Sequence, residues 1–395
     1  MECMKVYGGN SLLNLFLNKL YQARPGDFSS NGTAGGFNFS YNTLNAPTGK
    51  FVFSASPKPN LTIKLSSVDI RIARIGGAGP SLQVKYIINA TGKLTISNGI
   101  LSISSLNVAI ENPGVIDALI LPILNGNVLP AIQNSLQHIL LPQIQNIFGT
   151  GLNASLYSGK VISGPALLVG ARVSGQNISD ADNVSTIDLA SLNTNNVNKG
   201  KLIGLVSGAA INVLIRSRLT SIPSQSFDKR QNLIVGEIGI KGSVNASVPE
   251  FSISNSSGSA KTTISFNGVK VGGKLGFLPW LWFNIALPSF KVVVRHQLKV
   301  NNDKGIISLT GVDSLKVVFN NFPSELNGVK RDIENLFNNV VLPVFKSNIS
   351  NAIAGISFEV FDLPTRIPGT SLVSEIKYNG LGYYRSSVKA EIELK

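Results

Sequence analysis

The sequence predicts an α+β protein in which antiparallel strands dominate and each half carries one long helix. Three observations support this fold class. Apolar and polar residues alternate through most of the 395-residue chain, which is the period of a half-buried strand. Two stretches instead repeat apolar residues at helical spacing. These stretches and the strands before them match each other, which indicates an internal duplication of a whole domain.

The early strands carry the clearest alternation. Leu61, Ile63 and Leu65 point to one face, and the pattern resumes with a shifted phase at Val68 after Ser66 and Ser67. A phase shift of this kind predicts a bulge or bend. Further runs that predict strands are Leu94–Ile96, Leu101–Ile103, Leu106–Ile110, Val244–Ile253, Thr262–Phe266, Val292–Val300 and Ile306–Leu309. At the end of the chain, a turn signal at Asn379-Gly380 precedes a last half-buried strand from Val388 to Leu394.

Two long helices interrupt this rhythm. The first apolar stripe consists of Leu129, Ile132, Leu136, Ile139 and Leu140, and the second consists of Ile333, Leu336, Phe337, Val340, Val341, Val344, Phe345, Ile349 and Ile353. Residues 128–136 and 341–349 share their register, with a proline at the same place in each, about 210 residues apart. Gly99–Ile110 likewise parallels Gly305–Val318. A further helix is expected over Val206–Arg218.

The length predicts two domains. We place an N-terminal barrel at 1–174, a linker rich in Asn, Ser and Asp at 175–200, and a C-terminal barrel at 201–395; a long surface loop is the alternative for the linker. Apolar residues make up 43% and charged residues 14%, which suits large interiors and excludes a disordered chain. The apolar stretches are short and interrupted by proline, so no membrane-spanning helix is expected.

Residues for catalysis or metal binding are scarce. A single cysteine, Cys3, excludes an intrachain disulfide, and with only His138 and His296 a structural zinc site is not expected. The chain contains no nucleophile elbow, P-loop or zinc-protease motif, and Gly76–Pro80 reads as a glycine-rich hairpin. His138 is expected to be structural, and His296, in a basic strand, to face solvent. The sequence therefore predicts a protein that is not an enzyme and has no cofactor and no metal.

The net charge of +14 predicts acidic partners. Residues 1–190 carry 12 basic and 8 acidic side chains and residues 191–395 carry 23 and 13, so most of the excess lies in the second half. A nucleic-acid site would need aromatic residues among the basic strands, and residues 58–93 contain only Tyr86, so no nucleic acid is expected. Gathered at one tip, six early basic residues would attract lipid head groups, whereas scattered they would be solvated: Lys58, Lys64, Arg71, Arg74, Lys85 and Lys93.

An aromatic segment, Phe277–Phe283, holds both tryptophans of the chain. Aromatic rings with a polar edge favour a membrane interface, so Phe277, Trp280 and Trp282 are expected to contact a membrane if the segment is an exposed loop. Burial at a domain interface is the alternative. A curved sheet wrapped on a helix with a broad apolar face also makes an elongated barrel, whose interior either holds acyl chains or is an ordinary packed core.

Several segments together resemble the family of bactericidal/permeability-increasing protein and lipopolysaccharide-binding protein, whose relatives include lipid transfer proteins. They are the duplicated modules, the Asn-rich linker, Leu152–Gly175, Lys201–Ser207 and the tail Phe361–Ile367, Glu375–Leu381 and Val388–Ile392. The resemblance covers roughly residues 50–395. It implies a boomerang of two barrels joined by a central sheet, and non-covalent capture of phospholipid or lipopolysaccharide without catalysis.

The resemblance also suggests where the lipid binds. By position, we expect an N-terminal pocket lined by Ile70, Ile72, Val108, Leu129, Ile132, Leu136 and Ile139, and a C-terminal pocket lined by Val341, Leu342, Phe345, Ile349 and Ile353. The six early basic residues would form the basic tip. Antibacterial action or lipid transfer would follow from lipid capture, in a protein of innate immunity that works as a monomer on anionic membranes.

The compartment is suggested by ten glycosylation sequons, at Asn31, Asn38, Asn60, Asn89, Asn153, Asn177, Asn183, Asn245, Asn255 and Asn348. They favour a secreted glycoprotein, either extracellular or in the endomembrane lumen, although an Asn- and Ser-rich chain also contains such triplets by chance. Residues 1–9 do not read as a secretory leader. The alternative function is that of a structural or adhesive β-rich surface glycoprotein with solid cores.

Overall fold

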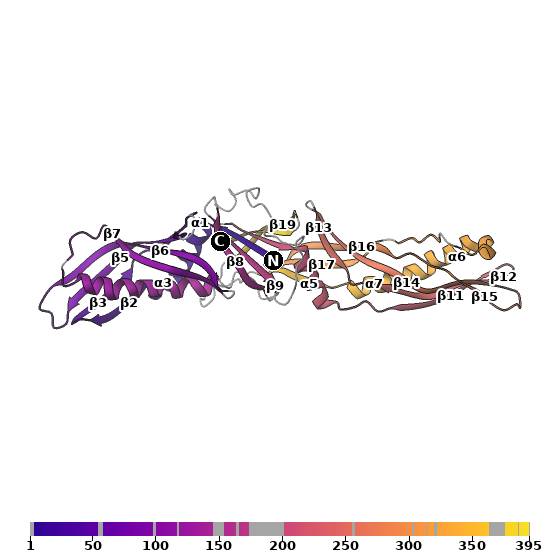
Figure 1. Cartoon of the computed structure of the whole chain (residues 1–395), viewed down its shortest axis with the longest axis horizontal. Helices are drawn as coiled ribbons and strands as arrows, with labels where there is room; N and C mark the ends of the chain where they lie inside the picture. The colour runs from indigo at the N-terminus through magenta and orange to yellow at the C-terminus, as the bar shows by residue number, and fades with distance from the viewer. Residues whose placement is uncertain are drawn as a thin grey trace.

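The computed structural model describes residues 4–53, 58–97, 100–116, 118–144, 154–162, 166–173, 201–254, 257–301, 304–313, 315–319, 322–362, 376–385 and 387–394. The molecule is elongated, with a curled sheet and its helix toward each end and a third sheet between them (Figure 1). The α+β class is confirmed, because strands dominate and each curled sheet carries one long helix. The predicted linker at 175–200 lies outside the described residues, so the domain boundaries stay a prediction.

The N-terminal sheet has six strands in the order β2-β3-β5-β6-β7, with β4 paired to β5. Their bounds are β2 Ser29–Ala34, β3 Phe37–Thr43, β4 Thr48–Phe51, β5 Leu61–Arg74, β6 Ser81–Ser97 and β7 Ile100–Glu111. In β5, Ile63 and Ile70 both face the interior, and the register with β6 shifts between Leu65 and Val68. The predicted bulge is therefore confirmed, and it keeps the apolar side chains of a long strand on one face.

The C-terminal sheet repeats this plan with eight strands, in the order β11-β12-β14-β16-β17-β18, while β13 and β15 pair with β14. The bounds are β11 Gln225–Leu233, β12 Gly236–Ala246, β13 Glu250–Ser254, β14 Ser257–Leu275, β15 Leu281–Asn284, β16 Phe290–Asn301, β17 Lys304–Val312 and β18 Ser357–Asp362. Helix α5 (Gly208–Arg218) lies where the sequence predicts one, and the Ser207 hydroxyl accepts a hydrogen bond from the Ala210 N–H as its N-cap.

Each long helix widens at the same place. One helical stretch consists of α2 (Leu121–Ile123), a π turn (Leu124–Val128) and α3 (Leu129–Ile144), and the other of α6 (Lys330–Leu336), a π turn (Phe337–Val341) and α7 (Leu342–Ile353). Pro130 and Pro343 each follow a π turn after one intervening leucine. A proline within a helix lacks an N–H and clashes with the carbonyl four residues earlier, and the wider turn accommodates it. The predicted duplication is confirmed even in this irregularity.

A 14-residue helix, α1 (Asn10–Ala23), was not expected from the sequence. Leu13 and Leu17 pack over Gly49 of β4, where a side chain would collide with them. The side-chain amides of Asn10 and Asn14 accept hydrogen bonds from the N–H groups of Phe51 and Gly49, at 2.7 and 2.6 Å. The helix therefore fastens the short strand β4. Its buried Leu13, Leu17 and Leu20 do follow helical spacing, which is the signal that could have predicted it.

The central sheet mixes strands from both parts of the sequence, in the order β19-β20-β10-β1-β9-β8. The bounds are β1 Met4–Gly9, β8 Ala154–Ile162, β9 Ala166–Val173, β10 Lys201–Ser207, β19 Ile376–Tyr384 and β20 Ser387–Leu394. The predicted last strand is confirmed as β20. The predicted turn at Asn379-Gly380 is wrong: both residues lie within β19, where the register with β20 shifts between Tyr378 and Gly380, so the pair forms a bulge.

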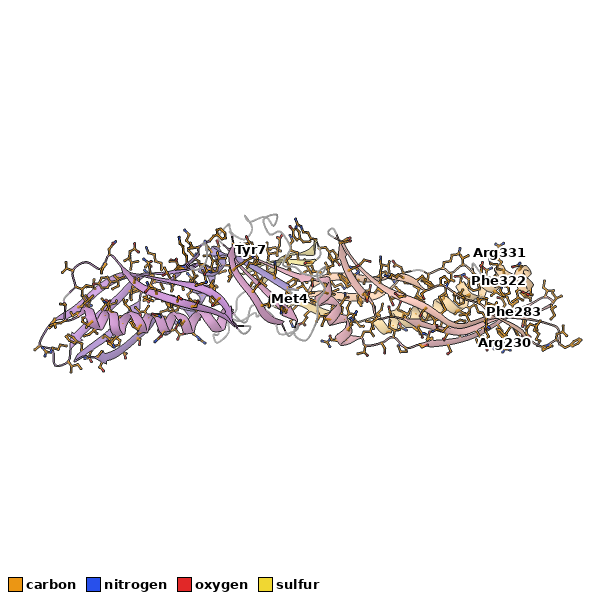
Figure 2. The ribbon with its side chains drawn as sticks, in the orientation of Figure 1. Met4, Tyr7, Arg230, Phe283, Phe322 and Arg331 are labelled. Carbon is orange, nitrogen blue, oxygen red and sulfur yellow. The ribbon has the colours of Figure 1, made fainter. Side chains whose placement is uncertain are left out.

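The two faces of the central sheet belong to different clusters. Val6, Leu202 and Val206 join the main hydrophobic core, which is continuous from the N-terminal half to the C-terminal half. Tyr7 faces a separate small cluster that contains Leu168 and Ile203. Figure 2 shows Tyr7 and Met4 near the middle of the molecule. Among the described residues, none of the helices has the length and apolarity needed to cross a lipid bilayer.

Candidate functional site

The interior of the N-terminal half lies between the concave face of its sheet and α3. The helix lies against β7 at one edge of the sheet and against β2 at the other, so it covers the gap between the two edge strands. Of the expected lining residues, five are buried here and Leu129 is half-buried against them; the five are Ile70, Ile72, Val108, Ile132 and Leu136. The side chain of Ile139 lies outside the described part of the structure. The sequence thus identified residues that share one interior.

The interior of the C-terminal half is built in the same way but with aromatic rings. The five residues expected there are all buried: Val341, Leu342, Phe345, Ile349 and Ile353. Phe337, on the π turn, lies at the centre of a ring cluster that was not singled out as a site. Its centroid is 5.5 Å from Phe319, 5.6 Å from Phe266 and 5.8 Å from Phe227. These partners come from distant strands, so local periodicity does not reveal the cluster.

The chemistry of both interiors is apolar. The buried polar side chains among the described residues are Lys5, Thr43, Ser207, Thr262 and Ser387. Lys5, Ser207 and Ser387 belong to the central sheet, and the Thr262 hydroxyl donates to the Ser247 carbonyl at 2.6 Å. Interiors of this kind disfavour a polar group, because a polar group buried there would lose its hydrogen bonds to water.

Each helix is tied to its sheet by a different set of polar contacts. In the N-terminal half, the Tyr41 and Ser135 hydroxyls lie 2.7 Å apart, and burial raises the pKa of Tyr41. In the C-terminal half, the Asn338 amide donates to the Val317 carbonyl at 2.9 Å and accepts from the Val317 N–H at 2.8 Å. Glu334 accepts from the Phe319 N–H at 3.0 Å. Tyr41 of β3 thus links the sheet to the first helix, and the second helical stretch is hydrogen-bonded to the backbone of the loop at Val317 and Phe319.

The structure does not gather the six early basic residues at one tip. They are spread along the solvent-facing side of β5 and β6, with Lys58 and Lys93 near one end of these strands and Arg74 at the other. A strand of this length spans about 45 Å. Lys64 pairs with Glu111 at 2.9 Å, and hydrogen bonds from Lys64 and Asn89 lower the pKa of Glu111. Arg71 pairs with Asp69 at 3.0 Å.

The two tryptophans form a plate on the C-terminal sheet. Their rings stack with centroids 4.9 Å apart and lie over Gly239 of β12, where a Cβ would stand 3.0 to 3.1 Å from both. Arg230 lies over the Trp280 ring at 4.9 Å, and the Lys241 ammonium lies over Trp282 at 4.2 Å. Trp280 and Trp282 are half-buried, whereas Phe277 is 99% exposed. Of the three residues expected at a membrane, Trp280 and Trp282 are therefore packed on the sheet, and Phe277 alone projects into solvent.

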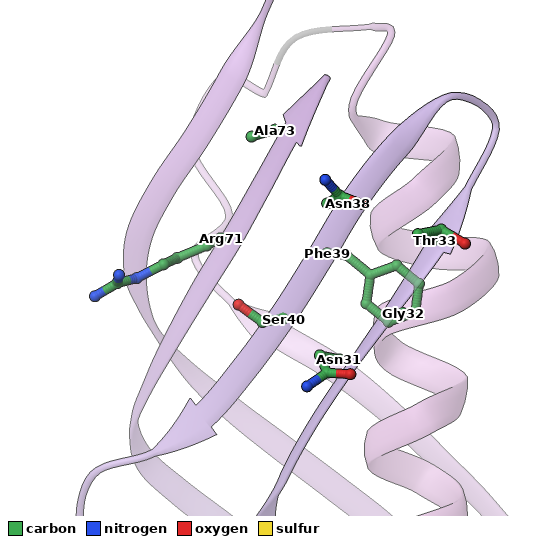
Figure 3. Close-up of a pocket in the computed structure, with 8 residues that line it drawn as sticks. All are labelled: Asn31, Gly32, Thr33, Asn38, Phe39, Ser40, Arg71 and Ala73. Carbon is green, nitrogen blue, oxygen red and sulfur yellow. The ribbon is translucent and has the colours of Figure 1, made fainter. Parts of the chain in front are cut away.

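An outward pocket of about 380 Å³ lies over β2, β3 and β5 (Figure 3). Polar residues line most of it, with the Phe39 ring over Gly32, and the residues are Asn31, Gly32, Thr33, Asn38, Phe39, Ser40, Arg71 and Ala73. Figure 3 shows the Arg71 side chain extending away from Phe39. Arg71 is already paired with Asp69, and although most lining residues are polar, most of the exposed lining surface of the pocket is apolar. It also contains two of the sequons.

A polar pair links the C-terminal sheet to the central sheet. His296 of β16 lies 2.6 Å from the Tyr383 hydroxyl of β19, through its Nε2 atom, and Phe251 packs edge-on against the imidazole. Burial lowers the pKa of His296 and raises the pKa of Tyr383 to about 12. The expectation that His296 faces solvent is wrong, because strand β19 covers it. Within the described ranges, no group of three or more His, Cys, Asp and Glu side chains is placed to hold a metal ion.

Comparison with known proteins gave structural matches alone. No family model and no curated protein matches this chain. Among solved structures, a lipopolysaccharide-binding protein is 11% identical, with a TM-score of 0.37 over 100% of this chain and 99% of that one. P47 of Clostridium botulinum E1 is 11% identical, with a TM-score of 0.43 over 100% and 99%. P47 of Clostridium botulinum A2 is 11% identical, with a TM-score of 0.37 over 99% and 97%. Membership of the family named from the sequence stays a prediction.

Proposed function

We propose that this protein binds lipid without catalysis, and that the acyl chains are buried beneath the long helix of each half. The observation that carries the proposal is the construction of the two halves. In each, one helix covers an open, curled sheet, and the space between them is lined by aliphatic and aromatic side chains. Such an interior can exchange side-chain contacts for contacts with hydrocarbon when the helix moves outward.

The energetics favour capture through the acyl chains. Each methylene removed from water contributes about 0.8 kcal/mol, so two long chains outweigh any exposed ion pair. The head group would stay at the surface, where the basic excess of the protein faces it. Phospholipid and the lipid part of lipopolysaccharide share this chemistry, and lipid transfer or antibacterial action would then be consequences of capture.

The helix also has features that suit an entrance. The π turn before Pro130 or Pro343 breaks the regular hydrogen-bond ladder in the middle of each helical stretch. In the N-terminal half, the Tyr41 hydroxyl links the sheet to the Ala131 carbonyl and to the Ser135 hydroxyl of α3. A helix held mainly by apolar contacts can shift without breaking many directional bonds.

A secreted or lumenal location is part of the proposal. Asn31 and Asn38 are exposed on adjacent strands, where an N-linked glycan could be attached without unfolding the sheet. Expression in a eukaryotic secretory host, followed by glycosidase treatment, should shift the mass of the protein. An unshifted mass would contradict the glycoprotein assignment and would leave lipid binding untouched.

Native mass spectrometry and lipid extraction of the purified protein test the function. We expect bound phospholipid in the wild type, and its loss from Phe345→Asp and Leu136→Asp, which place a charge in either interior. Because these variants can also unfold, Ile132→Phe and Ile349→Phe provide a second test: they fill space with an apolar ring, and circular dichroism reports their folding. Val344→Asp, on the exposed side of α7, is the matched control. A bare wild-type mass would contradict the proposal.

The second candidate is a structural or adhesive protein with solid cores. The Phe337 ring cluster favours it, because rings 5.5 to 5.8 Å apart already fill their neighbourhood. This candidate predicts that extraction yields no lipid and that Ile132→Phe and Ile349→Phe both destabilise the protein by overpacking.

A further inference from the structure

The far end of the C-terminal half is formed by two hairpin turns that lie side by side. The turn between β11 and β12 has Ile234 and Val235 at its tip, and the connection from β14 to β15 contains Gly276–Trp280. Gly236 pairs with Leu275, so the register of β12 and β14 brings the two turns to the same end of the sheet. Figure 1 shows β11, β12 and β15 reaching this end of the molecule.

The residues at these turns are apolar and exposed. Ile234 is 103% exposed, Val235 is 75% exposed and Phe277 is 99% exposed, and Leu275 and Leu278 are exposed beside them. Tight turns favour Gly, Asn, Asp, Pro and Ser, so turn geometry does not call for two β-branched residues at the tip of a hairpin. Water does not favour them there either, because each would be more stable in an apolar environment. An apolar medium beyond the end of the molecule would explain both why these residues are apolar and why they are exposed.

Behind the tip lies a band of basic and aromatic side chains. On the two hairpins, residues 228–241 and 270–284 contain five basic and two acidic side chains. Asp228 and Glu237 pair with Arg230 and Lys274, whereas Lys229 and Lys270 have no ion-pair partner in the described part of the chain. Figure 2 shows Arg230 and Arg331 at this same end. Arg230 is four residues from Ile234, which places it about 13 Å behind the tip.

We propose that this end of the molecule docks on an anionic lipid bilayer. The apolar turn tips enter the boundary between head groups and acyl chains, and Lys229, Lys270 and the other basic residues behind them face the phosphates. A burial depth of about 5 to 10 Å is typical of peripheral apolar segments. The basic residues, four or five positions and therefore about 13 to 17 Å behind the tips, then lie outside the acyl region, at the level of the head groups. The stacked tryptophans, fixed over Gly239, lie at the level of the head groups, where amphipathic rings are favoured.

This inference adds a docking surface to the proposed function and is tested apart from it. Vesicles of phosphatidylcholine, with and without phosphatidylglycerol, are mixed with the full chain and separated by flotation. The double variant Ile234→Asp/Phe277→Asp should lower partitioning to the anionic vesicles by about tenfold or more. Lys229→Gln/Lys270→Gln should lower it roughly fivefold for each charge at low salt and less at high salt. All four positions are exposed, so the fold should be unchanged.

Two controls fix the assignment to this end. Val344→Asp tests an exposed valine away from both ends, and Ile75→Asp tests an exposed isoleucine in the glycine-rich turn at the opposite end. Both should bind like the wild type. Wild-type binding by the double variant, or a loss in Ile75→Asp of the same size as in the double variant, would overturn the proposal. Equal binding to neutral vesicles would overturn the role given to the basic residues.

The failure of the proposed function is seen separately. Lipid that copurifies with Ile234→Asp/Phe277→Asp should equal that of the wild type, because the tip is remote from the α3 and α7 interiors. If the wild type carries no lipid, the interiors are solid and the vesicle experiment still decides whether this end docks.

Discussion

The two halves share a topology but differ in what fills them and in what they expose at their ends. The N-terminal interior consists mainly of Ile, Leu and Val, and its outermost turns contain glycines with positive φ at 35, 36, 76, 77 and 79 and expose Ile75 beside them. The C-terminal interior has the Phe337 ring cluster, and its outermost turns expose Ile234, Val235 and Phe277. Duplication thus fixes the strand order and the helix with its π turn. The two halves can differ in the residues at their turn tips and in the rings of their interiors without a change in this shared topology.

The largest effect that this comparison predicts is the loss of the central ring. Phe337→Ala should lower the free energy of unfolding by about 3–5 kcal/mol, because it opens a cavity that three other rings border. Phe277→Ala is the matched control in the same half, and being exposed it should change the stability by about 0.5 kcal/mol or less. Urea denaturation of both variants measures this. Similar losses in the two variants would mean that the ring cluster does not hold the C-terminal half together.

The way each helix is tied to its sheet predicts a smaller difference. Asn338→Leu removes both hydrogen bonds to Val317 and leaves that backbone unsatisfied, which should cost about 2–3 kcal/mol. Ser135→Ala removes one hydroxyl contact with Tyr41 and should cost about 0.5–1.5 kcal/mol. Hydrogen exchange of α3 and α7 in the two variants shows which helix is released. A larger loss from Ser135→Ala would reverse the assignment of α3 as the more loosely tied helix.

The sequence predicted those features that depend on local periodicity. In the two matching helices and in the strand from Val388 onward, apolar residues repeat with the period of the element, so neighbours along the chain determine it. The bulge after Leu65 shows as a shift in the phase of such a pattern. Helix α1 has the same kind of signal in Leu13 and Leu17, so local periodicity is sufficient to predict it as well. The lining residues of both interiors follow from the same periodicity, because the buried face of a helix must meet the concave face of its sheet.

Features that depend on register between distant strands could not be predicted. The Ile234 turn lies beside Phe277 because Gly236 pairs with Leu275, and nothing near either turn specifies that pairing. The tryptophans stack because Gly239, on another strand, leaves room for them. The six early basic residues alternate with buried ones in sequence, but only the lengths of β5 and β6 show that they are spread from one end to the other. The Asn379-Gly380 pair has turn chemistry, yet strand pairing with β20 makes it a bulge.

The smallest effect concerns pH and the junctions of the two halves with the central sheet. On the N-terminal side, α1 directly follows β1 of the central sheet and is joined to β4 by the amides of Asn10 and Asn14, which do not titrate. On the C-terminal side, His296 meets Tyr383, and burial holds the pKa of His296 below its ordinary value of 6.5. The folded protein therefore binds this proton less readily than the unfolded chain. As far as His296 is concerned, stability should be constant between about pH 9 and pH 6.5 and should decrease as the pH falls below 6.5.

Between pH 7.5 and pH 5, above the range in which Glu111 titrates, the decrease should come from the C-terminal junction. His296→Gln keeps a hydrogen-bonding side chain next to Tyr383 and removes the titration, so the difference in urea midpoint between pH 7.5 and pH 5 should shrink in this variant. Hydrogen exchange at the lower pH should accelerate in β16 and β19 before it accelerates in β1 and β4. The same pH dependence in His296→Gln as in the wild type would show that carboxylates elsewhere control the acid response, and the two junctions would then differ in structure but not in their sensitivity to acid.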